Sequence, residues 1–315
     1  MSMILRRLVA VVPLLLAVSF AVYSLEVFLP GDPALTIAGA DASDARVDEV
    51  RTALGLDRPL PVRYVEWLGD AVQGDLGNSL FTRRSVTQEI TSRWLVTATL
   101  VVGAMGVALL VGVPAGILAG RHKGGWIDRI ATLGASLGVA IPHFLLGILL
   151  MVVLAINLRW LPVAGYRPFG NGLWAWGKHF VLPILALSGV MTAELTRQVR
   201  SALAETLESD YIRTARSKGL SERTVLVKHG LRVAASPAIS VISVQAARLF
   251  GGAVIIELVF GLPGLGRLTV DAILNRDLPV LQGVVPLAVI IAIVMTLLAD
   301  VLQLVLHPRL RTASR

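Results

Sequence analysis

Few residues in this chain could support catalysis, and their spacing argues against it. The stretch GLWAWGKH at 172–179 satisfies G-x-x-x-x-G-K, but His179 stands where a phosphate-binding loop needs Ser or Thr to hold Mg²⁺. Neither H-E-x-x-H nor G-x-S-x-G occurs, and there is no cysteine to serve as a thiol nucleophile or metal ligand. We therefore predict a chain that is not an enzyme and has no metal or cofactor of its own.

The charged stretch SDYIRTARSKGL at 209–220 has a different character. It places Asp210, Arg213, Arg216 and Lys218 between two long apolar runs, where a short hairpin would suffice. Ser209 or Asp210 can cap a helix that runs over 211–218, with Lys218 near the negative end of the helix dipole. Gly219 then suits the left-handed position after the helix, and Ser221 can cap a second one.

One face of that helix carries a narrow stripe of apolar residues with modest side-chain volume. Ile212, Ala215 and Gly219 recur at spacings of three and four, Tyr211 borders them, and the cations surround the rest. Such a stripe suits insertion into a cleft of a partner protein with an acidic rim. The alternative is an interfacial helix that lies on anionic lipid.

The composition indicates a membrane protein. Of the 315 residues 55% are hydrophobic and 16% charged, and the mean hydropathy is +0.74. The first apolar run exceeds the length of a signal-peptide core and lacks a clear cleavage site, so we interpret it as a retained helix. Glu194 makes the fourth run the weakest. The predicted spans are 8–29, 95–119, 130–156, 179–198, 233–256 and 284–306.

The distribution of charge orients these spans. Segments 1–7, 120–129, 197–232 and 307–315 together hold 16 Lys and Arg against 5 Asp and Glu, and the opposite segments hold 12 against 13. The positive-inside rule therefore predicts that both termini are cytoplasmic. Because topology accounts for the basic surplus, it does not indicate nucleic-acid binding.

Two outer segments are more elaborate than simple connections. Loop 30–94 predicts a short helix near 47–56 and a second over 61–72, which form either a cap on the bundle or a landing surface for an external partner. The stretch FGLPGLGRLTV at 260–270 contains Gly261, Pro263, Gly264 and Gly266. It predicts a tight re-entrant turn, or glycines that simply form a turn.

Polar residues inside spans are candidates for a translocation pathway. Glu194, Arg248 and Asp300 lie in the last three spans, and His143 follows Pro142 in the third. Each could face a pathway, pair with another of them, or pair with a partner chain.

Small residues and prolines also mark the spans. Gly112, Gly116 and Gly120 are spaced by four, as are Gly134 and Gly138, which predicts close helix packing. Three prolines predict kinks or local unwinding, and they are Pro114, Pro142 and Pro286.

With these features in place, the chain resembles the permease subunits of binding-protein-dependent ATP-binding-cassette (ABC) importers. DYIRTARSKGL resembles their cytoplasmic loop in the oligopeptide, dipeptide and nickel family, where Ala215 and Gly219 keep the signature spacing. Arg213 and Thr214 replace its Glu and first Ala, and Val233 and Ser236 depart from common residues before Pro237. Further stretches resemble the B-type subunit in order: LPGDP, GDLGNSL, GGAVIIELVFGLPGLGRL, RDLPVLQGVV and LLADVLQLVLHPRLR.

The resemblance implies an all-α polytopic membrane protein with the type I ABC importer fold. It implies a first helix with an external loop over 1–92, a permease core over 93–306 and a tail over 307–315. Residues 208–219 would form a coupling helix that docks on an ATPase, and Gly261, Pro263, Gly264 and Gly266 would belong to the external gate or contact the binding protein. The implied coupling residues are Glu208, Asp210, Tyr211, Ile212, Arg213, Thr214, Ala215, Arg216, Lys218 and Gly219.

The implied partners are a second permease, two ATPase subunits or domains that bind ATP and Mg²⁺, and an extracytoplasmic peptide-binding protein. Peptides are the expected cargo, with nickel complexes, glutathione and haem as alternatives. The bacterial inner membrane is the expected location. A self-sufficient secondary transporter would explain the spans, but it leaves the charged inner loop without a purpose. A purely structural subunit would differ only in not lining the pathway.

Overall fold

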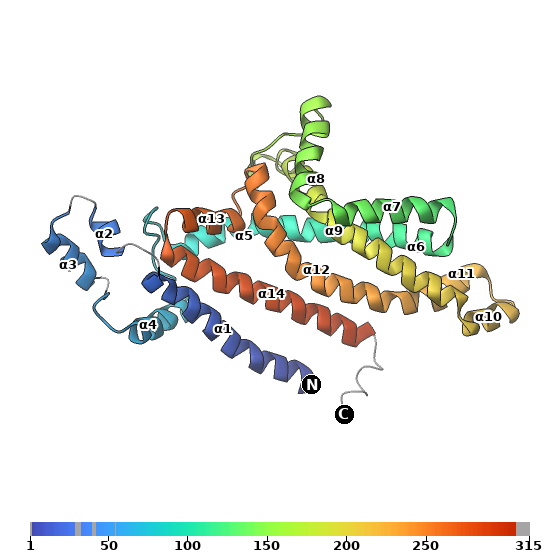
Figure 1. The fold of residues 1–315 in the computed structure, drawn as a ribbon, viewed down its shortest axis with the longest axis horizontal. Coiled ribbons are helices and arrows are strands. Elements are labelled where there is room, and N and C mark those ends of the chain that lie inside the picture. Colours follow the sequence, from blue (N-terminus) through green and yellow to red (C-terminus); the bar gives the residue numbers. More distant parts are fainter. Residues whose placement is uncertain (1, 29–32, 40–41, 54, 307–315) are drawn as a thin grey trace. The chain divides into compact units, whose positions relative to one another are not determined.

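A computed structural model describes residues 2–28, 33–39, 42–53 and 55–306 (Figure 1). In this part of the chain the secondary structure is helical, apart from an isolated bridge between Asn78 and Ser85. The helices are α1 (Ser2–Phe28), α2 (Pro33–Ala38), α3 (Asp44–Ala53), α4 (Leu60–Val72), α5 (Val86–Val107), α6 (Val113–Arg121), α7 (Trp126–Ala140), α8 (His143–Leu150), α9 (Leu173–Glu208), α10 (Asp210–Ser217), α11 (Glu222–Thr224), α12 (Leu231–Phe260), α13 (Leu265–Leu274) and α14 (Leu278–Leu306). π-helical segments cover Ala108–Gly112, Met151–Asn157 and Val225–Gly230, and Phe169–Asn171 is 3₁₀.

Five of the six predicted spans are confirmed as helices long and apolar enough to cross a membrane. The fourth, which Glu194 made the weakest, lies within the 36-residue helix α9. The π segment between α5 and α6 joins them into one span. The spanning segments are Val11–Phe28, Val86–Arg121, Leu173–Glu208, Ala238–Phe260 and Leu278–Leu298.

The third predicted span, 130–156, is not one straight helix. It consists of α7 and the helix His143–Asn157, which meet at an angle of 106°. Ile141 and Pro142 between them are extended, with ψ of 117° and 140°. Pro142 lacks an N–H and disfavours helical backbone at the preceding residue, so the helix stops there. The kink predicted at this proline is therefore a complete break.

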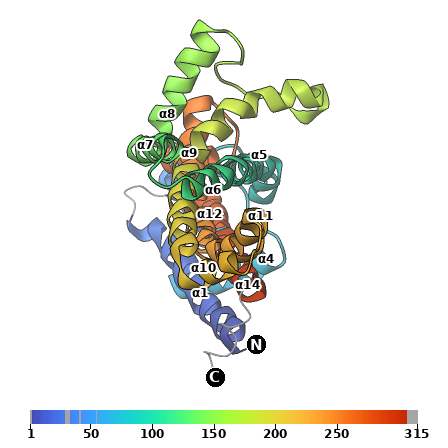
Figure 2. The ribbon, with the colours of Figure 1, turned by 90° about the vertical axis from the view of Figure 1, so that its right-hand side faces the viewer.

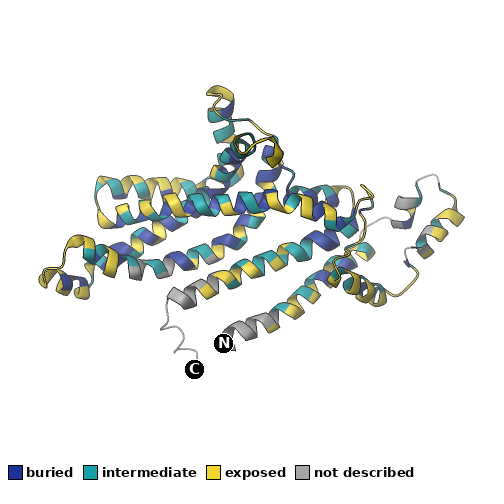
Figure 3. Cartoon of the chain, turned by 180° about the vertical axis from the view of Figure 1, so that it is seen from behind, coloured by how far each residue is buried: buried dark blue, intermediate teal, exposed yellow. Residues whose placement is uncertain are grey.

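The chain divides into two compact units, which we describe separately. Unit 1 comprises Met1–Leu95 with Arg267–Ile291, and unit 2 comprises Val96–Gly266 with Ala292–Arg315. The core of unit 2 forms where α9 packs against α12 and the α5–α6 helix, and its largest buried side chains include Leu195, Phe180 and Phe260. Figure 3 shows that buried and exposed residues alternate along these helices, as amphipathic packing requires. The predicted division at residues 92 and 93 stays a prediction.

Close packing at the glycine ridge of unit 2 is confirmed. A Cβ built on Gly112, Gly116 or Gly120 would lie 2.8, 2.7 or 2.9 Å from a backbone oxygen of α9. Thr196 also donates a hydrogen bond to the Gly112 carbonyl at 3.2 Å. Gly138 likewise approaches Ala193, whereas a Cβ on Gly134 would meet nothing within 4 Å.

In unit 1 the two predicted outer helices are confirmed as α3 and α4. Tyr64 of α4 and Ser19 of α1 share a hydrogen bond of 2.7 Å. One residue earlier in α4, Arg63 binds both carboxylate oxygens of Glu26 at 2.9 and 2.7 Å. These contacts hold α4 against α1.

Candidate functional site

Helix α10 lies beside α11 at the end of unit 2 where α6 and α7 are joined (Figures 1 and 2). Ser209 precedes its first turn in extended conformation, and its hydroxyl donates to the Thr206 carbonyl instead of capping α10. Gly219 ends the helix with φ of +78°, and the Leu220 N–H reaches back to the Ala215 carbonyl at 3.3 Å. This is a Schellman cap, for which glycine is the favoured residue. The Ser221 cap on the next helix is also confirmed, because its hydroxyl accepts from the Thr224 N–H.

The small apolar stripe of α10 faces the chain itself. Ile212 is 0% exposed and Ala215 8%, and both pack with Val225 and Leu207. The expectation that this stripe inserts into a partner is therefore wrong for these two residues. Periodicity identified an apolar face, but the π-helical segment after α11 folds back and covers it. The stripe anchors α10 instead of presenting it.

Charged side chains fix the same loop in place. Arg216 donates to both carboxylate oxygens of Glu222 at 2.7 and 3.2 Å and to the Leu207 carbonyl at 3.3 Å. The hydrogen bond between the two side chains lowers the pKa of Glu222 and raises that of Arg216. At the end of α9, Glu208 binds Lys123 at 2.7 and 2.8 Å. Glu208 and Arg216 thus connect segments of the inner loops.

The remaining side chains of α10 point outward. Tyr211 is 47% exposed, and the Arg213 and Asp210 side chains are 71% and 95% exposed with 3.4 Å between them. Thr214 and Lys218 are exposed as well. The result is a short, capped helix that is anchored on one face and presents a tyrosine and mixed charge on the other.

On the opposite side, the glycine-rich turn of 261–266 packs around a buried carboxylate. Gly261 ends α12 with φ of +64°. Glu257 is fully buried and accepts from the Thr97 hydroxyl at 2.6 Å, and that hydroxyl accepts from the Leu265 N–H at 2.8 Å. A Cβ on Gly264 would collide with the Glu257 carboxylate.

The other two residues of the predicted turn also have assigned places. A Cβ on Gly266 would lie 2.5 Å from the Val254 Cα. Pro263 is half-buried. The tight turn is thus a packed structural feature, in which glycine is needed at 264 and 266 for space. Whether it meets an external protein stays a prediction.

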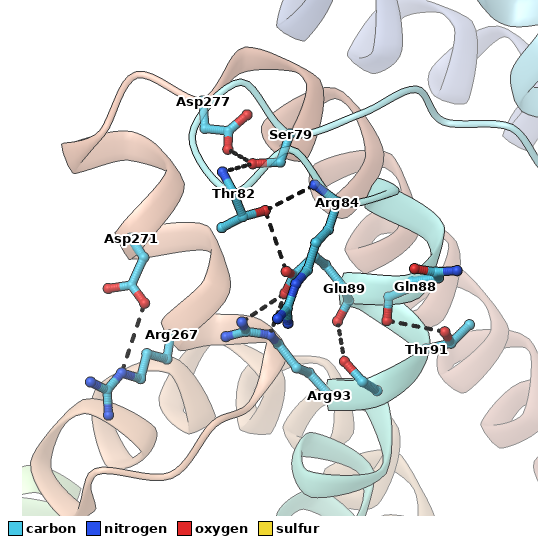
Figure 4. Close-up of polar contacts among 11 residues, drawn as sticks. Ser79, Thr82, Arg84, Gln88, Glu89, Thr91, Arg93, Arg267, Asp271 and Asp277 are labelled. Carbon is cyan, nitrogen blue, oxygen red and sulfur yellow. Dashed lines mark hydrogen bonds and ion pairs between the residues drawn. The ribbon is translucent and has the colours of Figure 1, made fainter.

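Unit 1 contains a polar cluster at the start of α5 and the end of α13 (Figure 4). Buried Asp277 accepts hydrogen bonds from the Ser79 hydroxyl and, at 3.0 Å, from the Leu80 N–H. Glu89, also buried, accepts two bonds from Arg93 at 3.1 and 2.7 Å. Sequence reasoning did not single out these residues. GDLGNSL and RDLPVLQGVV carry part of the cluster, but no spacing rule connects residues 198 positions apart.

The pathway candidates fall into different surroundings. Glu194 accepts a hydrogen bond from Gln245 of α12, so its partner here is an amide. The His143 imidazole lies against Gly252, where a Cβ would be 3.3 Å from its Nε2. Arg248 is exposed on α12, and the side chain of Asp300 lies outside what the structure describes. The structure brings none of the four into direct contact among the described side chains.

The stretch 172–179 has no phosphate-binding geometry. Gly172 precedes α9, and Lys178 and His179 lie on consecutive positions inside that helix. The Nδ1 atom of His179 forms a hydrogen bond with the Ala175 carbonyl oxygen at 2.8 Å. Trp176 packs on Phe180, with 4.9 Å between ring centroids.

An ion pair between α7 and α9 was not predicted from the sequence. Asp128 of α7 is 4% exposed and receives two bonds from Arg200 of α9, at 2.8 and 2.7 Å. The Gly124 N–H also donates to this carboxylate at 2.8 Å. The two residues are 72 positions apart, so only the packing of α7 on α9 reveals the pair.

The spans, the packed glycine ridge and an anchored charged helix between α9 and α12 define a polytopic membrane protein in which a capped charged helix connects two spans. Residues 112–312 match the family described as binding-protein-dependent transport system inner membrane component, and residues 1–101 match its N-terminal counterpart. The chain therefore belongs to this family of ABC importer permeases and is a multi-pass inner-membrane protein.

Curated relatives and a solved structure agree with this membership. The chain is 39% identical over 308 residues to a probable peptide ABC transporter permease of Sinorhizobium fredii, covering 98% of each. It is 40% identical over 306 residues to the glutathione permease GsiC of Pectobacterium atrosepticum, covering 97% of each. A chain of the inward-facing MetNI methionine ABC transporter shares the fold, with a TM-score of 0.54 at 17% identity, over 67% of this chain and 92% of that one.

Proposed function

We propose that this chain is a permease subunit of a peptide importer. In this proposal it forms the translocation path with a second permease, and separate ATPase subunits drive transport of cargo delivered by an extracytoplasmic binding protein. The peptide and glutathione transport named for its relatives supports short peptides as the cargo class, glutathione itself being a tripeptide.

The observation that carries the proposal is the construction of α10. A connection between two spans needs neither a buried apolar anchor nor a Schellman cap, yet α10 has both. A rigid helix can transmit a push from an ATPase to α9 and α12, whereas a flexible loop would absorb it. The proposed contact face is the exposed one, with Tyr211, Arg213 and Lys218 in its centre.

The experiment is reconstitution of the chain with its genomic-neighbour permease and ATPase subunits in proteoliposomes. Labelled di- and tripeptides are supplied with the binding protein, and uptake is measured with ATP and with a non-hydrolysable analogue. The variant Arg213→Glu reverses one charge on the proposed contact face. Arg129→Glu on exposed α7 is the matched control, because it makes the same charge change elsewhere on the cytoplasmic side.

We expect ATP-dependent uptake in the wild type and the control, and at least a tenfold loss in Arg213→Glu together with loss of bound ATPase. ATP-independent uptake that ignores Arg213→Glu would favour a secondary transporter. ATP-dependent uptake of another cargo, with peptides rejected, would keep the importer and exclude its proposed substrate.

A further inference from the structure

Unit 1 contains an apolar cavity of about 490 Å³ between α1, α4, the start of α5 and α14. Its walls are mainly aliphatic, with Leu16, Leu68, Ile90 and Leu287 among them. The portions of α1 and α14 that line it belong to the segments Val11–Phe28 and Leu278–Leu298, which are candidate membrane spans. At that depth the surrounding solvent is hydrocarbon, so an acyl chain is the natural occupant of such walls.

A second cavity of about 190 Å³ shares the side chain of Trp67 with the first. Its lining has the opposite character, with two arginines and three carboxylates. They are Arg58, Arg63, Glu66, Asp70 and Asp75. An apolar and a charged cavity with one common wall match the two ends of an amphiphile.

Trp67, which lines both cavities, carries an unsatisfied polar group. Its indole Nε1–H is buried and has no hydrogen-bond partner among the described residues. A buried donor without an acceptor is destabilising, and buried tryptophans normally find one. The ring itself is held by Tyr23 and Tyr64, at centroid distances of 5.6 and 6.1 Å. The ring is therefore fixed in position, and none of the described residues supplies an acceptor for its N–H.

Charge in the second cavity selects the head group. Arg58 lies 2.6 Å from Glu66, so a bound phosphate would share this arginine with a carboxylate. Asp70 and Asp75 add further negative charge beside it. A purely anionic head group would meet repulsion from these carboxylates, whereas a zwitterion can place phosphate at the arginine and its cation at the aspartates. A primary ammonium also donates N–H hydrogen bonds to the carboxylates, which the quaternary ammonium of choline cannot do.

We propose that these two cavities form a binding site for one zwitterionic aminophospholipid, of the phosphatidylethanolamine type. An acyl chain occupies the apolar cavity, an oxygen of the ester or phosphate region accepts from Trp67, and the ethanolamine reaches the charged cavity. The lipid thereby joins α1 and α4 to α14. The inference is independent of the transported cargo, because it concerns only unit 1 and the membrane.

The test uses the full chain purified in complex with its partners and stripped of lipid in mild detergent. Dioleoyl phosphatidylethanolamine, phosphatidylglycerol and phosphatidylcholine are titrated separately, and retained lipid is measured by native mass spectrometry. Trp67→Phe removes the N–H and keeps an aromatic ring, while Ala71→Phe fills the apolar cavity it lines. Val65→Phe is the control, because Val65 lies on the same helix, 64% exposed and outside both cavities.

We expect preferred retention of phosphatidylethanolamine by the wild type and Val65→Phe. Affinity should fall about fivefold in Trp67→Phe, as for loss of one hydrogen bond, and at least tenfold in Ala71→Phe. Equal retention of all three lipids, or equal loss in the control, would overturn the proposal.

A second measurement avoids dependence on these substitutions. The photoreactive residue p-benzoylphenylalanine replaces Leu68, which lines the apolar cavity. Irradiation in native membranes followed by intact-mass analysis should give an adduct with the mass of phosphatidylethanolamine. A crosslink to another protein chain instead would show that a partner helix, and not a lipid, covers the cavity.

Discussion

Replacing Gly116 by alanine should destabilise the packing of α6 on α9. The added Cβ would lie 2.7 Å from the Thr196 carbonyl oxygen and 2.8 Å from the Val199 Cβ. Real Cβ contacts are not that short, and the nearest obstacle is backbone. The two helices must therefore move apart by several tenths of an ångström, a shift that the flanking close contacts at Gly112 and Gly120 resist.

The size of the effect follows from overpacking. Forcing one methyl group into a well-packed interface costs about 1–3 kcal/mol. Alanine is intrinsically the better helix former, by roughly 0.5–1 kcal/mol, which offsets part of that cost. We expect a net destabilisation of about 0–2.5 kcal/mol, with a central value of roughly 1 kcal/mol. At about 2–4 °C per kcal/mol for a protein of this size class, the melting temperature should fall by several degrees.

The assay is thermal unfolding of the detergent-purified chain, followed by tryptophan fluorescence. Gly134→Ala is the matched control, because this glycine is also helical but a Cβ there would meet nothing within 4 Å. Its melting temperature should stay unchanged or rise slightly. Equal melting temperatures for both variants, or a greater loss in Gly134→Ala, would refute the reasoning that close helix approach, and not glycine content, is what the ridge provides.

Three further predictions concern the inner side of the chain. Gly219 has φ of +78° and open space around it, so Gly219→Val should strain the α10 cap by about 1–2 kcal/mol and reduce the amount of co-purified ATPase. Gly219→Asn, which tolerates this backbone conformation, should retain the ATPase. Equal ATPase retention by both variants would contradict the importance of the cap. Arg200→Met should destabilise the chain by about 1.5–3 kcal/mol, because Asp128 loses two charge-assisted hydrogen bonds and keeps only the Gly124 N–H and the Thr132 hydroxyl as donors. Adding Asp128→Leu should recover most of this loss in thermal unfolding. Arg216 lowers the pKa of Glu222, so the stabilisation from this ion pair should be constant from pH 6 to 8 and be lost only on acidification through that lowered pKa. Cleavage of the loop by a protease should therefore increase at acid pH in the wild type but not in Glu222→Gln.

Several features were predictable because they depend on neighbours in the sequence. Spans of about 20 apolar residues must form helices in lipid, since the backbone has no other hydrogen-bonding partners there. The C-terminal end of α10 follows from Gly219, which takes the predicted left-handed position. The glycines at 112, 116 and 120 share one helix face by their spacing, and the structure places that face against α9.

Other features could not be predicted, because they depend on which segments meet. The spacing of Ile212 and Ala215 predicts an apolar stripe on α10. Only the structure shows that the π-helical segment 225–230 of the same chain packs against this stripe and covers it. Pro142 predicted a kink or local unwinding in the third span, but the angle of 106° between its two helices could not be predicted from the proline alone. Glu257 directly follows the predicted fifth span, and only the fold shows that it is the buried centre of the outer turn.

The sequence by itself determined the membrane class, the number of apolar segments, the charge bias of the inner loops and the family resemblance. Each of these depends only on residues that are close together in the sequence, through hydropathy, helix caps and short motifs. Tertiary structure alone decided the pairing of Asp128 with Arg200, of Glu257 with Thr97 and of the two cavities at Trp67. Such contacts join residues from about seventy to more than two hundred positions apart. Their geometry is set by how whole helices pack, and no pattern within one helix specifies it.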